Sequence, residues 1–109
     1  MAWSEWKKFG VDSNQSPQIV NSVVIGNKIT TGYKPTYIII LMRWDRHSSS
    51  LYYLYDFSKN TCRYVNSYNL ENNLIPISSN TDITLTVEND GFTIIQNIDG
   101  ITLLDVFYI

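Results

Sequence analysis

The strongest constraint on the fold is the run from Gly32 to Trp44, GYKPTYIIILMRW. Pro35 fixes its own φ and disfavours a helical conformation at Lys34, so the run opens with a turn. Three consecutive isoleucines behind a proline then favour a strand over a helix. Neighbouring side chains of a strand point to opposite faces, and here both faces are apolar: Ile38, Ile40 and Met42 on one, Tyr37, Ile39 and Leu41 on the other. The run therefore predicts a central strand that is covered on both sides.

The composition indicates a single folded domain. The chain has 109 residues, 44% of them hydrophobic and only 17% charged, which argues against a disordered chain and against a charged helical bundle. Eight tyrosines and three tryptophans are typical of β-rich proteins and of contact surfaces. The single cysteine, Cys62, excludes an intramolecular disulfide and a zinc site of four cysteines.

Charge and hydropathy exclude two classes of partner. The net charge is −2 and Lys7–Lys8 is a pair rather than a basic patch, so we expect no nucleic-acid binding. The longest apolar stretch, Tyr37 to Met42, is far shorter than a membrane span, so we expect no membrane insertion. The start, MAWSEWKKFG, lacks the apolar region of a signal peptide.

Alternating apolar residues and turn signals predict seven or eight short strands and no long helix, as expected of an all-β antiparallel β-sandwich or jelly-roll-like domain over residues 19–109. The expected strands cover residues 19–25, 28–31, 36–44, 51–57, 61–68, 83–87, 92–98 and 101–109. Asp99–Gly100 predicts a type I′ hairpin between the last two. Residues 69–80, rich in Asn and Ser, are expected to be an irregular connection.

Two strands carry further expectations about their faces. Between residues 51 and 57, one face holds Leu51, Tyr53, Tyr55 and Phe57, and the other holds Tyr52, Leu54 and Asp56. In the last strand Leu103 and Phe107 fall on one face and Leu104 and Val106 on the other, so both faces should be covered.

The N-terminal residues 1–18 are interpreted as an aromatic connector. Trp3, Trp6 and Phe9 are spaced by three, which suits one helical turn. Two interpretations stay open at this point. The aromatic side chains plug an edge or end of their own domain, or they pack on a neighbouring domain or subunit.

A polar loop after the central strand, with its flanks, supplies the candidate ligand-binding residues, which are Arg43, Trp44, Asp45, His47 and Tyr52. Trp and Tyr rings stack on sugar rings, while Asp, Arg and His form directional hydrogen bonds. The alternative is a loop that is merely solvated.

Catalytic and metal sites have weaker support. Asp45, His47 and Ser48–Ser50 include the residue types of a hydrolytic triad, but a triad draws its members from separate segments. Two ligands, Asp45 and His47, are too few for a metal. A thiol–imidazole pair of Cys62 and His47 is a further, weaker alternative. We therefore expect no enzyme activity and no cofactor.

Four sequence elements resemble a known family. In chain order they are Gly32–Ile38 (GYKPTYI), Leu54–Phe57 (LYDF), Asn89–Ile94 (NDGFTI) and Val106–Ile109 (VFYI). From Ile19 to the C-terminus, their order and spacing resemble a small β-sandwich module of phage and prophage tail-fibre receptor-binding proteins, similar in outline to H-type lectins.

The resemblance implies a function outside the cell. A module of this kind is a structural part of the virion tail, forms a homotrimer and recognises a host cell-surface glycan. The matched residues build the fold, and none of them forms a sugar-binding motif. A different hypothesis, allowed by the short chain and mild acidity, is a small phage protein that binds and modulates a host protein.

Overall fold

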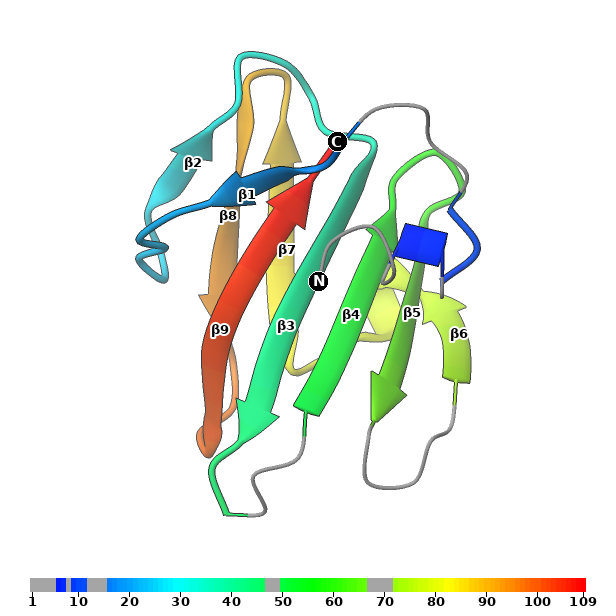
Figure 1. The fold of residues 1–109 in the computed structure, drawn as a ribbon, viewed down its shortest axis with the longest axis vertical. Coiled ribbons are helices and arrows are strands. Elements are labelled where there is room, and N and C mark those ends of the chain that lie inside the picture. The colour runs from blue at the N-terminus through cyan, green and yellow to red at the C-terminus, as the bar shows by residue number, and fades with distance from the viewer. Residues whose placement is uncertain (1–5, 8, 12–15, 47–49, 67–71) are drawn as a thin grey trace.

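The computed structural model describes residues 6–7, 9–11, 16–46, 50–66 and 72–109. Within these residues, nine strands form two antiparallel sheets that pack face to face (Figure 1). The large sheet has the order β1 (Gln18–Val20), β9 (Ile101–Tyr108), β3 (Tyr37–Trp44), β4 (Ser50–Asp56), β5 (Thr61–Asn66), β6 (Asn72–Pro76). The small sheet has the order β2 (Lys28–Thr30), β8 (Gly91–Gln96), β7 (Ile83–Glu88). The prediction of an antiparallel β-sandwich is confirmed.

The central strand lies between β9 and β4 and is buried on both faces, as the sequence predicts. Ile38, Ile40 and Met42 are fully buried in the core between the two sheets. On the opposite, outer face, Ile39 is also fully buried, in a second apolar cluster with Leu54, Val65 and Phe107. Burial of apolar area is the main source of folding free energy, so both layers stabilise this strand.

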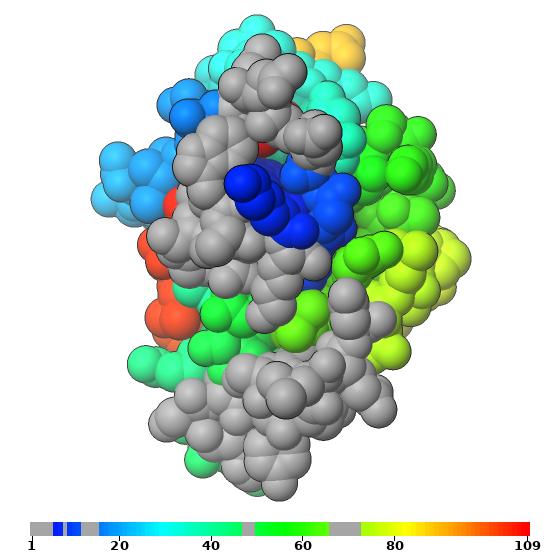
Figure 2. All heavy atoms as spheres, turned by 45° about the vertical axis from the view of Figure 1, so that its right-hand side comes forward, coloured from blue at the N-terminus to red at the C-terminus, as the bar shows by residue number. Residues whose placement is uncertain are grey.

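The N-terminal residues form the cover of the outer face. Trp6 is fully buried, and Phe9 and Val11 are nearly so, all three in the second cluster. A compact turn holds them: the amide of Val11 donates to the carbonyl of Trp6 at 2.9 Å. Figure 2 shows these residues in blue, seated against the green β4–β5 region. The prediction that the aromatic side chains plug their own domain is therefore confirmed for Trp6. This plug closes a face of the large sheet rather than an edge or end of the domain. Trp3 lies outside the described residues.

The hairpin prediction at Asp99–Gly100 is wrong. β8 belongs to the small sheet and β9 to the large sheet, so residues 97–100 cross from one layer to the other. Gly100 has a φ of +85°, but Asp99 does not have the positive φ that a type I′ turn requires. Gln96 stabilises the crossover, because its side-chain amide donates to the carbonyls of Ile98 and Ile101 at 2.9 and 3.0 Å.

A β-bulge changes the faces of the last strand. Leu41 and Met42 of β3 pair with Asp105 and Leu103 of β9, so Leu104 is the extra residue. Leu103 therefore joins Val106 in the core between the sheets, and the prediction that it shares a face with Phe107 is wrong. Leu104 is 42% exposed, so this strand is less fully covered than predicted.

Two further boundaries differ from the predictions. The first predicted strand is much shorter: β1 ends at Val20, and Ser22 adopts a φ of +60°. The predicted connection 69–80 contains the edge strand β6, paired with β5, and the short 3₁₀ helix η1 (Ile77–Ser79). Tertiary pairing has overridden the low strand propensity of Asn and Pro in β6.

Replacing Trp6 by alanine should destabilise the protein by about 3–5 kcal/mol, because the substitution leaves a cavity over Ile39 and Phe107. The matched variant Trp6→Phe should lose much less. It keeps an aromatic ring and removes an indole N–H that is buried without a hydrogen-bond partner in the described part of the chain. Urea unfolding followed by circular dichroism measures both. A loss below about 1 kcal/mol for Trp6→Ala would show that the plug contributes little.

Candidate ligand-binding site

Three of the five ligand-binding residues predicted from sequence lie on strands of the large sheet, and the structure places them on different faces. Arg43 and Tyr52 belong to the alternation that faces outward, and Tyr52 packs beside Phe9. Trp44 points to the opposite face and packs against the core between the sheets. Asp45 is exposed in the turn after β3, and His47 lies outside the described residues. Ligand binding by this set stays a prediction.

Asp45 makes contacts that shape the turn. Its carboxylate accepts a hydrogen bond from the hydroxyl of Thr102, and its amide donates to the carbonyl of Gly100 at 2.9 Å. These contacts fasten the end of β3 to the start of β9. Asp45 is thus part of the support for Trp44, its neighbour in the chain.

Trp44 lines a groove on the inner side of the large sheet, with a volume of about 400 Å³. We call it the inner groove. In Figure 1 the small sheet lies behind β1, β9 and β3, while the segment from η1 to β7 crosses behind β4 and β5. The floor is formed by Trp44, Leu51, Tyr53, Tyr64 and Ile75, and the wall by Ser79, Asn80, Thr81 and Asp82. The groove therefore combines an aromatic floor with a polar wall.

The aromatic floor comes from facing positions on neighbouring strands. Tyr53 of β4 pairs in register with Tyr64 of β5, and the two ring centroids are 5.8 Å apart. Tyr53 is only 3% exposed, whereas Tyr64 and Trp44 are half-buried and present ring surface to the groove. Tyr55 of β4 and Phe57, which directly follows the end of β4, continue this face as predicted from the alternation, and their rings are stacked.

The polar wall is held by hydrogen bonds to this floor. The hydroxyl of Tyr53 donates to Oδ2 of Asp82 at 2.8 Å. The side-chain amide of Asn80 donates to the hydroxyl of Tyr55 at 2.7 Å, while its oxygen accepts from the amide of Asp82 at 3.1 Å. Burial, followed by the bond to Asp82, raises the pKa of Tyr53 well above its ordinary value. The wall and floor thus form a preorganised unit, in which Tyr53 stays protonated at neutral pH.

Cys62 lies behind the floor, fully buried, with its sulfur 3.6 Å from Nδ2 of Asn80. Burial raises the pKa of the thiol to about 11. Since the thiolate is the reactive form, this thiol is a poor nucleophile at neutral pH.

Sequence reasoning found part of the inner groove. The alternation in β4 placed Tyr53 on a shared face with Leu51, and Trp44 was selected as a ligand-binding residue. Asn80 and Asp82 were missed, because Asn80 ends the stretch predicted to be irregular and Asp82 lies between that stretch and the next expected strand. A usable signal was the Asn–x–Asp spacing directly before β7, which is typical of a side chain that hydrogen-bonds the backbone two residues on.

Comparison with protein-family models, with curated proteins and with solved structures gives no match for this chain. In the described part of the chain, no helix is long and apolar enough to cross a membrane. Among the same residues, His, Cys, Asp and Glu form no group of three or more that could hold a metal ion.

Cys62 should resist a thiol reagent such as dithionitrobenzoate at pH 8 in the folded protein and react at once in urea. Rapid labelling without denaturant would contradict the buried position of the thiol.

The free energy of unfolding should also fall as the pH rises from about 9 to 11. In that range the unfolded chain has already released the thiol proton, whose ordinary pKa is 9.0, and the folded chain still holds it. The variant Cys62→Ala should show a shallower decrease in stability over this pH range. Some decrease should remain, because Tyr53 and Tyr55 also have raised pKa values.

Proposed function

We propose that this protein is a glycan-binding module without enzyme activity, of the kind found in receptor-binding parts of phage tail fibres. One observation carries the proposal: the inner groove places the rings of Trp44 and Tyr64 beside the side chains of Asn80 and Asp82. The C–H face of a sugar ring packs on an aromatic ring, and its hydroxyls hydrogen-bond with carboxylates and amides.

The dimensions of the inner groove also suit this ligand. Its volume of about 400 Å³ falls within the range of about 300–1,000 Å³ that is typical of small-molecule sites. Tyr53 and Asn80 are already fixed by hydrogen bonds, so little side-chain entropy is lost when a ligand binds. The inner groove is therefore preformed and needs no closing movement of the protein to bind a ligand, which suits a recognition module.

The proposed setting is the virion tail, made in the host cytoplasm and acting at the host cell surface. It is supported by the order of the elements from Gly32 to Ile109 that resembles tail-fibre modules. A single shallow groove binds a sugar weakly, and several identical subunits raise the overall affinity by multivalency. We therefore propose a homotrimer.

A surface away from the inner groove is available for such assembly. The segment that joins β1 to β2 exposes Val24 and Ile25, which are 57% and 39% exposed. The amide of Gly26 donates to the carbonyl of Ile94 at 2.9 Å, which holds this segment beside Ile95, itself 39% exposed. Adjacent apolar side chains on a surface are typical of protein–protein contacts.

Trp44→Ala and Tyr64→Ala should each weaken glycan binding about tenfold, since each removes a stacking surface worth on the order of 1.4 kcal/mol. A glycan array identifies the ligand, and titration calorimetry measures the dissociation constant. The matched control is Tyr33→Ala, which removes an exposed ring, 45% exposed, outside the groove. Unchanged binding by both groove variants, or no bound glycan for the wild type, would refute the proposal.

The mass in solution tests the proposed assembly. Light scattering on a sizing column should give three times the chain mass of 12.6 kDa. The variant Val24→Asp should then give a monomer, because a charge in the centre of the apolar contact is costly to bury. A monomeric wild type would contradict the trimer and favour the alternative of a small protein that modulates a host protein.

A further inference from the structure

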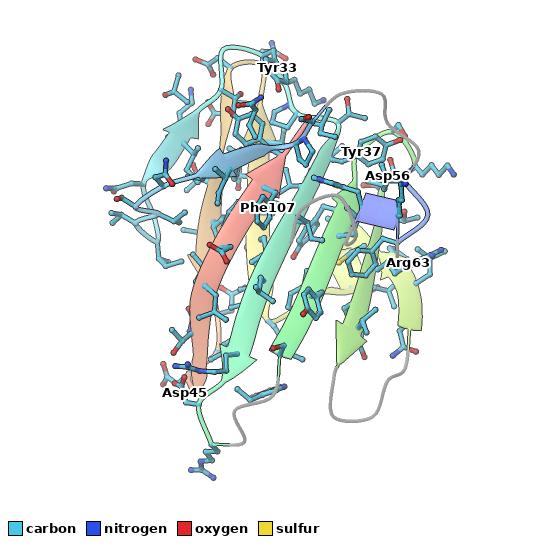
Figure 3. The ribbon with its side chains drawn as sticks, in the orientation of Figure 1. Tyr33, Tyr37, Asp45, Asp56, Arg63 and Phe107 are labelled. Atoms are coloured by element: carbon cyan, nitrogen blue, oxygen red, sulfur yellow. The ribbon has the colours of Figure 1, made fainter. Side chains whose placement is uncertain are left out.

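A second hollow, the outer groove, lies on the opposite face of the large sheet. Its volume is about 200 Å³, and it forms where the N-terminal residues meet β4 and β5. Three of its lining residues, Tyr37, Asp56 and Arg63, lie beside the N-terminal turn in Figure 3. The volume is below the usual range of about 300–1,000 Å³ for small-molecule sites, so it suits a single sugar unit that carries one acid group.

Arg63 is the central charge of the outer groove. It pairs in register with Leu54 on one side and Leu74 on the other, so its side chain leaves the outer face between two apolar neighbours. Arg63 is half-buried as a residue, and its Nη1 donates to the carbonyl of Phe9 at 3.3 Å. This bond fixes the guanidinium in the groove wall and uses one of its five N–H donors.

Lys59 brings a second positive charge to the same groove. It is exposed in the β4–β5 turn, where Oδ1 of Asp56 accepts bonds from the amides of Ser58 and Lys59 at 3.0 and 3.2 Å. The carboxylate of Asp56 is therefore engaged in holding the turn. Among the described residues, ion pairs within 4.0 Å form only at Lys28, so neither Arg63 nor Lys59 is neutralised by a carboxylate there.

We propose that the outer groove binds a carboxylate or phosphate group carried on a sugar. The planar fork of Arg63 matches the two oxygens of such a group, and Lys59 adds a point charge. Tyr37, which is half-buried, and Leu74, which is 55% exposed, give the apolar wall against which the ring of the sugar packs. Two cations against one carboxylate make this spot positive on a chain whose net charge is −2.

The outer groove is separate from the inner groove. Leu54 and Arg63 alternate along β4 and β5 with Tyr53 and Tyr64, so each pair of neighbours sends one side chain to each face. The whole thickness of the large sheet lies between the two sites. Binding at one is thus measurable in a variant of the other.

The test is a titration of the ¹⁵N-labelled protein followed by NMR, with three probes: glycerol 1-phosphate, glucuronate and uncharged glucose. The backbone amides of Lys59 and Thr61 should shift and reach saturation with at least one of the acidic probes, and glucose should leave them unshifted. Tighter binding of glycerol phosphate indicates a phosphate-bearing ligand. Tighter binding of glucuronate indicates a uronic acid.

Arg63→Gln should weaken the binding of the acidic probe at least tenfold, and Lys59→Gln several-fold. Arg46→Gln removes the same charge beyond the far end of β3 and should bind as the wild type does. Trp44→Ala should also keep this binding, which separates it from the inner groove. If Arg63→Gln does not fold, Arg63→Lys and Lys59→Gln decide, since Lys59 is exposed. Absence of saturation, or equal weakening by Arg46→Gln, would overturn the proposal.

Discussion

The burial of β3 on both faces is the constraint on which the rest of the structure depends. An antiparallel sheet usually packs one face on a core and turns the other to water. Here Ile39 is as deeply buried as Ile38 and Ile40, so the outer face needs its own apolar cover. Trp6 and its neighbours supply that cover. At the central strand the molecule therefore has three layers, which are the small sheet, the large sheet and the N-terminal residues. The outer groove lies where the described residues of this third layer meet β4 and β5.

The sequence correctly predicted those parts of the fold that are determined by residues close together in the chain. The central strand and the alternation in β4 follow from residue order, and they are found where predicted. The layer crossing after Gln96 did not follow, because Asp99–Gly100 is equally compatible with a hairpin and with a change of sheet. The bulge at Leu104 depends on the register of β9 against Leu41 and Met42, which is a long-range property that the sequence of one strand does not contain.

In the candidate site, too, residue type was predictable from the sequence, whereas positions that depend on distant parts of the chain were not. Trp44 was recognised by residue type, and its face followed only from the pairing of β3 with its neighbours. Asn80 and Asp82 reach the inner groove through η1 and β6, neither of which was predicted, so their position beside Tyr53 could not be derived. Arg63 drew no attention in the sequence, because a lone arginine in a strand acquires meaning only from the carbonyl of Phe9, far away in the chain.

The plug over the outer face also sets the order in which the chain can complete its fold. Trp6 is synthesised before the surface that receives it is complete, because that surface includes Phe107 and Ile109. During synthesis the indole and Phe9 therefore stay unburied until β9 has paired with β3. Packing of the plug therefore joins segments that are far apart in the chain, around Trp6 and around Phe107.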